Sequence, residues 1–236
     1  MECKVIALET CEFETLLLAM AGHDLRQPLQ MLQYVHDRFG NGARTRSELD
    51  MLRVGQSAID RLREQLDQLL AALQLRERAG HIEASPVALE PLLREVYRES
   101  EWSALQKGIE IRLVPSAARI MSDPLLFRAV LRNLLNNAIK YTEPGGRILL
   151  GCRHFRDCIR IDVIDTGVGI SEEQLPRIFE AFARFDTSRN DGLGIGLFIV
   201  RQVVAMLGHR VDVCSVLSRG TRFSILAKLA HGSEPS

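Results

Sequence analysis

NLLNNAIKYT, residues 133–142, is the stretch of sequence that decides the fold. At 100° per residue its polar side chains share one face of a helix, namely those of Asn133, Asn137, Lys140 and Tyr141. Apolar side chains occupy the opposite face: Phe127, Leu131, Leu134, Leu135, Ala138 and Ile139. The pattern predicts a helix that packs on a sheet and presents two amides and an ammonium group outward.

The start of this helix is also marked. Asp123 is a good N-cap and Pro124 suits the first helical position, so we expect a helix over residues 123–141. Its polar face suits a magnesium nucleotide, because an amide oxygen can ligate a hard cation and a lysine can meet phosphate charge. A solvated surface face would show the same pattern if this helix stood alone.

Two glycine-containing loops follow. Asp165, Gly167 and Gly169 (DTGVG) come directly after an apolar strand, where a carboxylate can accept a hydrogen bond from an exocyclic amine such as that of adenine. Further on, GLGIG introduces an apolar helix, whose N-terminus can cradle phosphate. Each loop alone is a weak signal. A dinucleotide-binding βαβ unit would need its glycines just after an early strand, whereas these come late and follow a polar loop.

The N-terminal third shows a helical seven-residue repeat. One track holds Leu18, Leu25, Leu32 and Phe39, and after the break at Gly40–Gly42 a second holds Leu52, Ile59, Leu66 and Leu73. Two long amphipathic helices joined by a turn predict an antiparallel hairpin. One hairpin cannot bury the apolar residues of both its helices by itself. We therefore expect a dimeric four-helix bundle, in which two copies cover each other's apolar faces. A coiled-coil spacer without chemistry would read the same way.

A charged, proline-closed segment, residues 76–86, marks a linker. We therefore expect two domains, 1–80 and 81–236. In the second, we expect helices at 89–106, 123–141 and 194–208, and strands at 109–114, 147–154, 158–165, 211–217 and 221–229. The predicted fold class is α+β: a helical hairpin followed by a two-layer α/β sandwich with a mixed, mostly antiparallel sheet and its helices on one face.

The motifs together resemble a known family. NLLNNAIKYT, DTGVGI, IFEAFARF and GLGIGLFIV, in this order, resemble the N, G1, F and G2 boxes of histidine-kinase ATP-binding domains in the GHKL superfamily. Upstream, AGHDLRQPL resembles the H box that bears the phospho-accepting histidine. The resemblance covers roughly residues 14–230 and implies a GHKL-type fold for the second domain.

This resemblance also implies a nucleotide site for ATP and Mg²⁺. Asn137 would ligate the magnesium ion, and Asn133 would support the metal–phosphate site. Lys140 would meet phosphate and Tyr141 would lie beside the nucleotide, while Asp165 would read the adenine amine.

The glycines have implied roles too. Gly167 and Gly169 would shape the base pocket. Gly192, Gly194 and Gly196 would form the hinge of a lid over the phosphates.

His23 is the expected phospho-acceptor. It follows the seam residue Gly22, so its ring should lie exposed at the flank of the bundle. An imidazole with an ordinary pKa of about 6.5 is largely neutral and nucleophilic at cytosolic pH. Asp24 can orient the ring or take its proton, and Pro28 loosens the helix one turn on. The resemblance implies autophosphorylation of His23, then transfer to an aspartate of a response-regulator receiver domain.

Two positions depart from the family pattern. Gln27 stands where relatives commonly carry Thr or Asn, which leaves phosphatase activity open. The segment between Arg184 and Gly192 is short for an ATP lid. Phe179 and Phe182 resemble the F-box pair, as packing or as contact residues.

Composition narrows the remaining choices. Thirty basic and thirty acidic side chains cancel, so we expect no nucleic-acid partner. The longest apolar run near the N-terminus, residues 16–21, is far below the roughly 18 residues of a membrane span. Five scattered cysteines suit reduced thiols and a cytoplasmic location. Cys152, His154 and Cys158 are close in sequence, but a fourth zinc ligand is missing.

The expected partners are a second copy of the chain, a receiver domain and a separate sensory protein. A non-catalytic scaffold with a degenerate nucleotide domain is the rival reading, although Asn137, Lys140, Asp165 and the glycine loops are intact. A GHKL serine kinase, or an ATPase of the gyrase or chaperone type, would leave the His23 hairpin unexplained.

Overall fold

The computed structural model describes residues 84–181, 183 and 194–230, together with a few isolated residues nearer the N-terminus. Those isolated residues are all helical: Leu32, Tyr34, Asp50, Val54, Gly55, Ala58, Ile59 and Leu62. Apart from these residues, the predicted hairpin lies outside the described part of the chain, as do His23, Asp24 and Gly192. The dimeric bundle and the domain division therefore stay predictions.

The chain divides into two compact units, of which Leu75–Phe185 with Gly196–Ser236 is the one described in detail. Its five-stranded sheet has the order β2-β4-β5-β7-β6, in which β2 and β4 are parallel and the other neighbours antiparallel. The elements are β1 (Ser85–Ala88), α3 (Leu89–Lys107), β2 (Glu110–Val114), β3 (Arg119–Ser122), α4 (Pro124–Tyr141), β4 (Arg147–His154), β5 (Cys158–Asp165), the 3₁₀ turn η1 (Leu175–Arg177), α5 (Gly196–Met206), β6 (Arg210–Val216) and β7 (Gly220–Lys228).

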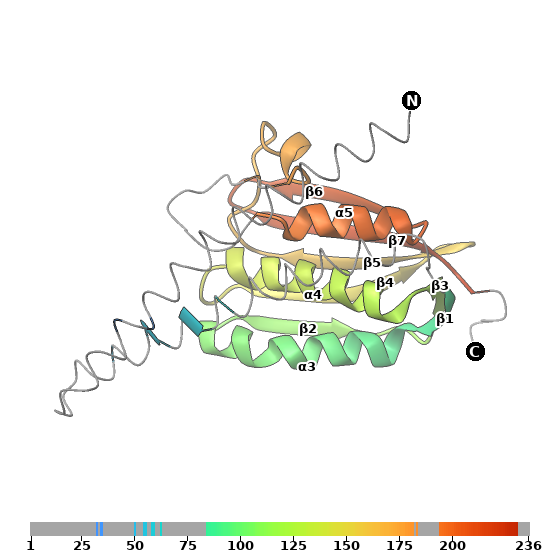
Figure 1. Cartoon of the computed structure of the whole chain (residues 1–236), viewed down its shortest axis with the longest axis horizontal. Helices are drawn as coiled ribbons and strands as arrows, with labels where there is room; N and C mark the ends of the chain where they lie inside the picture. Colours follow the sequence, from blue (N-terminus) through green and yellow to red (C-terminus); the bar gives the residue numbers. More distant parts are fainter. Residues whose placement is uncertain are drawn as a thin grey trace. The chain divides into compact units, whose positions relative to one another are not determined.

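Helices α3, α4 and α5 lie side by side over one face of this sheet (Figure 1). The predicted two-layer sandwich with a mixed sheet is confirmed. None of the helices in the described part of the chain has the length and apolar character needed to cross a membrane.

The core lies between the helices and the three central strands. Alternate residues of β5 are buried, and they pair across the sheet with buried residues of β4 and β7, as in Leu150↔Val163 and Ile161↔Ile225. The apolar face of α4 covers them with Leu131, Leu134 and Leu135, all at most 1% exposed. Burying one such side chain contributes about 1.5–3 kcal/mol, so this layer holds the polar face of α4 outward.

Both ends of α4 are held by charged side chains. At the N-terminus, Asp123 Oδ1 accepts hydrogen bonds from the backbone N–H groups of Leu125 and Leu126, at 2.9 and 3.0 Å, which confirms the predicted N-cap. At the C-terminus, Lys107 Nζ of α3 donates to the carbonyl oxygens of Ile139 and Lys140, at 2.7 and 2.6 Å. An anion at the N-terminus and a cation at the C-terminus both match the helix dipole.

Beyond shifts of one or two residues at the ends of elements, the structure differs from the sequence-based expectations at β1 and β3 and at the start of α5. Ser85 and Pro86, expected in the linker, belong to β1, which pairs antiparallel with the equally unexpected β3. Strands of four residues carry too short a pattern to be recognised, and a two-stranded ribbon tolerates a proline that lacks an N–H. Helix α5 begins at Gly196, not at residue 194, because Gly194 has a left-handed φ of +70°.

His209, just after α5, joins three elements. Its ring packs edge-on against Phe127 of α4 with centroids 5.6 Å apart, and its Nε2 lies 3.1 Å from Ser122 Oγ of β3. Its Nδ1 is buried and has no hydrogen-bond partner among the described residues. Burial disfavours the charged ring and lowers the pKa of His209 to about 4.

We predict that acid weakens the fold through His209. The pKa of His209 is about 6.5 in the unfolded chain and about 4 in the folded protein. Between these pH values the unfolded state therefore binds more protons. Stability that is present above pH 6.5 is therefore lost as the pH falls towards 4, by about 1–2 kcal/mol at pH 5. Urea unfolding at pH 7 and 5 checks this, because His209→Gln should lose less stability over the same interval. An equal loss in both proteins would contradict it.

Candidate functional site

The loop after β5 packs directly on the C-terminal end of α4. The N–H of Val168 donates to the carbonyl oxygen of Tyr141 at 3.1 Å. A Cβ on Gly167 would lie 2.4 Å from that same oxygen, so only glycine permits the approach. The structure thus places the DTGVG loop beside the helix end that carries Lys140 and Tyr141.

Asp165 is the buried carboxylate of this site. Its side chain is 6% exposed, and its Oδ1 accepts hydrogen bonds from the N–H groups of Gly167 (2.8 Å) and Thr221 (3.1 Å). Burial raises the pKa of Asp165, while the two N–H groups oppose that rise. No described residue donates to Oδ2. One oxygen is therefore held in place, and the other can accept a hydrogen bond from a ligand's amine.

The polar face of α4 is present as predicted. Asn133 is half-buried, and its amide nitrogen donates to the Ala129 carbonyl at 2.9 Å, which leaves its side-chain oxygen as an acceptor. The side chain of Asn137, also half-buried, makes no hydrogen bond with the described residues. The Lys140 ammonium lies 5.5 Å from the centroid of the Tyr141 ring, and Tyr141 is 38% exposed.

This donor set fits a metal ion carried by a phosphate ligand. Among the described residues, no group of three or more His, Cys, Asp or Glu side chains could hold a metal. The amide oxygens of Asn133 and Asn137 are hard donors of the kind that Mg²⁺ prefers, and phosphate and water usually complete its octahedral shell.

Gly169 also lets the DTGVG loop pack closely against the turn between β6 and β7. Gly169 has φ +70°, and a Cβ there would lie 2.2 Å from the Val216 carbonyl oxygen. The Ser218 N–H donates to the Val168 carbonyl at 2.7 Å, and the Ile170 N–H donates to Ser215 Oγ at 2.8 Å. These contacts leave the loop little freedom beside Asp165.

Gly220 and Thr221 belong to this site and were missed in the sequence. Gly220 has φ +107°, and a Cβ there would lie 2.0 Å from the Asp165 carbonyl oxygen, while Thr221 holds the carboxylate through its N–H. In the sequence, SRGTRF reads as a turn between two strands. Only the pairing of β7 with β5 brings this turn against Asp165.

The remaining predicted residues are placed as follows. Gly194 belongs to the other compact unit, and Gly196 is the first residue of α5. Cys152 and Cys158 lie on opposite faces of the sheet. Cys152 pairs with Ile161 and shares its face, whereas Cys158, three residues before Ile161 on β5, points to the other face. Burial raises the pKa of Cys152 to about 12, so its thiol is a poor metal ligand.

A family profile described as histidine kinase-, DNA gyrase B-, and HSP90-like ATPase matches residues 122–231. These residues belong to that ATPase family. The match runs from the residue before the α4 N-cap to just beyond β7 and so contains Asp165, Gly220 and the polar face of α4. The predicted GHKL fold is thereby confirmed for this part of the chain.

Curated relatives extend the likeness to most of the chain. It is 32% identical over 208 residues to the sensor histidine kinase CusS of Escherichia coli O157:H7, which covers 86% of this chain and 43% of the relative. It is 29% identical over 228 residues to the adaptive-response sensory kinase SasA of Synechococcus elongatus, covering 91% of this chain and 59% of the relative. The chain thus spans about half the length of these relatives and is homologous to that part of each.

Solved structures agree with this relationship. Full-length ShkA in complex with AMPPNP matches with a TM-score of 0.65 and 28% identity, over 94% of this chain and 47% of that one. The catalytic domain of the histidine kinase ThkA matches with a TM-score of 0.56 and 26% identity, over 62% of this chain and 95% of that one.

Gly169 and Gly208 form a matched pair for testing the loop. Their φ angles are +70° and +69°, but a Cβ on Gly208 would meet nothing within 4 Å. We predict that Gly208→Ala costs only about 1 kcal/mol of backbone strain. Gly169→Ala should cost at least about 2 kcal/mol more, because the Val216 carbonyl must move. Urea unfolding measures both, and equal losses would show that the loop can shift freely.

Proposed function

We propose that this chain is the catalytic core of a two-component sensor histidine kinase, which moves the γ-phosphate of ATP to its own His23 and passes it to an aspartate of a receiver domain. The observation that carries the proposal is that Asp165, buried and with no described donor to its Oδ2, begins the loop that packs on the end of α4 bearing Asn137 and Lys140. The homology of the chain to sensor histidine kinases supports the same reading.

Asp165 reads the base in this proposal. Its Oδ2 accepts the exocyclic amine of adenine, while Oδ1 stays bound to the N–H groups of Gly167 and Thr221. Gly167 and Gly169 shape the base pocket by letting the loop approach the Tyr141 and Val216 backbones, and Tyr141 lies beside the nucleotide. Guanine presents a carbonyl oxygen at the matching position, so the carboxylate would reject it.

The α4 face serves the phosphates. Asn137 holds Mg²⁺ through its amide oxygen, Asn133 supports it from one turn earlier, and Lys140 meets phosphate charge. When bound, Mg²⁺ neutralises charge on the phosphates. Gly192, Gly194 and Gly196 form the lid hinge, and the short helix α5 follows it.

Transfer then forms an N–P bond at His23 and breaks the bond between the γ-phosphorus and the oxygen bridging to the β-phosphate. ADP leaves, and Asp24 orients the imidazole or takes the ring proton. Catalysis of this kind rests on positioning and on neutralising phosphate charge.

The hairpin supplies the dimer in this proposal, with residues 1–80 as the phosphotransfer domain and 81–236 as the ATP-binding domain. Support comes from the exposure of an apolar seam residue in the single chain, since Ile59 is 46% exposed. A second copy would cover such a stripe. A receiver domain and a separate sensory protein are the further partners, in the cytoplasm.

We predict that His23→Ala abolishes phosphorylation without weakening nucleotide binding. The measurement is incubation of the full chain with γ-labelled ATP and Mg²⁺, followed by acid and alkali treatment of the labelled protein. Wild type should carry acid-labile, alkali-stable label, and the variant none. Label that persists in His23→Ala would exclude His23, and nucleotide binding without any phosphohistidine in wild type would favour a scaffold.

Asp165→Asn should selectively weaken adenine recognition. An amide that rotates to keep its oxygen towards Gly167 and Thr221 presents N–H groups to the adenine amine, so donor faces donor. We expect ATP affinity to fall by about 10- to 100-fold, corresponding to about 1.4–2.8 kcal/mol, with GTP affinity changed less. Calorimetric titration with both nucleotides measures this. Equal losses for ATP and GTP would remove Asp165 from base recognition.

A further inference from the structure

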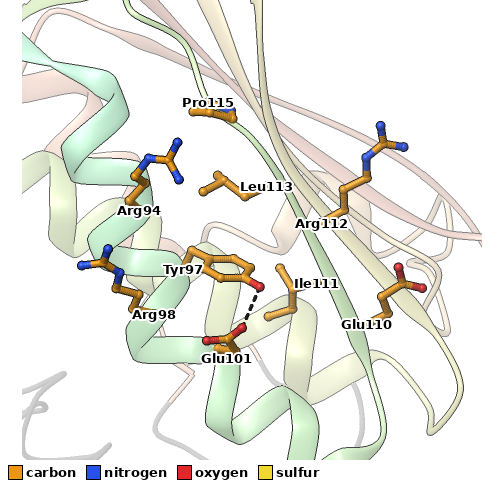
Figure 2. Close-up of a pocket in the computed structure, with 9 residues that line it drawn as sticks. All are labelled: Arg94, Tyr97, Arg98, Glu101, Glu110, Ile111, Arg112, Leu113 and Pro115. Carbon is orange, nitrogen blue, oxygen red and sulfur yellow. Dashed lines mark hydrogen bonds between the residues drawn. The ribbon is translucent and has the colours of Figure 1, made fainter.

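A groove of about 530 Å³ lies between helix α3 and the edge strand β2, and it contains none of the nucleotide-site residues. Figure 2 shows the side chains of Tyr97, Ile111 and Leu113 between the helix and the strand. Arg94, Arg98 and Glu101 line the helix side. We call this the α3–β2 groove.

Strand β2 has one unused edge. The Glu110 N–H donates to the Gly146 carbonyl at 3.1 Å, so in this parallel ladder the backbone groups of Glu110 and Arg112 face β4. The N–H and C=O groups of Ile111 and Leu113, which alternate with them, face away from the sheet. No described residue pairs with these groups, and β2 is the last strand of its sheet. Such an edge is a template for another extended strand.

Some charged side chains along this edge have hydrogen-bond or ion-pair partners among the described residues, and others have none. Glu101 accepts a 2.8 Å hydrogen bond from the Tyr97 hydroxyl, and Arg94 pairs with Glu90. Neither Arg98 nor Arg112 forms an ion pair with any described residue, and both are exposed. Glu110, on the same face of β2 as Arg112, is also exposed and has no ion pair among these residues. The lining holds three arginines and two glutamates, so its charge is basic by a small excess. Figure 2 shows Arg112 on the side of β2 opposite to α3. Because side chains alternate along a strand, a strand added here would meet Arg98 on one face and Arg112 on the other.

Apolar anchors continue the same stripe of α3. Trp102 and Leu105 follow Arg98 by four and seven residues, and each is 66% exposed. Tryptophan, tyrosine and arginine are the residue types concentrated in binding hot spots, and two large exposed apolar side chains on one helical stripe are typical of an interaction surface.

We propose that the α3–β2 groove binds an extended, acidic segment of a partner protein, which adds to β2 as an edge strand. The arginines alone would also suit a phosphate backbone, but the alternating N–H donors and C=O acceptors of Ile111 and Leu113 match the backbone of an extended polypeptide strand. The proposal is independent of the nucleotide site.

The first test uses the wild-type full chain and labelled peptides of defined sequence. A blocked peptide of alternating glutamate and valine should give saturable fluorescence anisotropy and change the emission of Trp102, the single tryptophan of the chain. A lysine–valine peptide, and a glutamate–valine peptide N-methylated at alternate positions, should bind at least about tenfold more weakly. Absence of saturable binding, or equal binding of all three, would overturn the proposal.

The second test reverses the arginine charges. Arg98→Glu and Arg112→Glu should each weaken the glutamate–valine peptide by at least about tenfold, whereas Arg156→Glu, an exposed arginine between β4 and β5, should not. Nucleotide binding should be unchanged in all three variants. Unchanged peptide affinity in both groove variants would contradict the proposal, and so would displacement of the peptide by a deoxythymidine oligonucleotide at equal charge concentration.

Discussion

The site depends on one buried carboxylate. Asp165 ends β5 and receives N–H groups from its own loop and from β7, so its position is set by two segments far apart in the sequence. Backbone approaches that only glycine allows hold those segments together, at Gly167 against Tyr141 and at Gly220 against Asp165. A loop of this kind cannot move at one of these contacts without moving the carboxylate.

Helix α4 supplies the second half of the site, and its position depends on Asp123 and Lys107, which are not among the proposed nucleotide-site residues. Asp123 satisfies the first N–H groups, and Lys107 satisfies two of the last carbonyls. Helix α3 thus takes part in the site through Lys107, whose contacts lie next to Lys140. The same helix presents its other side to the α3–β2 groove, so one element borders both surfaces.

Long, regular patterns were the predictable part of the fold. The limits of β4 and β5 match the predicted 147–154 and 158–165, and α4 follows its predicted cap. Strands β1 and β3 escaped prediction because four residues carry little periodicity, and their pairing partners lie far away in the sequence: β1 pairs with β3, and β3 also bridges to Leu229 beyond β7. In the site, Asp165, Gly167 and Gly169 stood out because they are adjacent in one motif, whereas Gly220 had no such context.

The sequence by itself determined the order of the elements, the polar face of α4 and the family to which the ATPase domain belongs, since each depends on residues that are neighbours along the chain. Only the tertiary structure decided which oxygen of Asp165 is held by the backbone, why Gly220 must be glycine, and which strands lie at the two edges of the described sheet. These features arise from strand pairing between residues such as Asp165 and Thr221, which are 56 positions apart. No local pattern records which partner a strand will choose, because pairing is decided by the packing of the whole sheet against its helices.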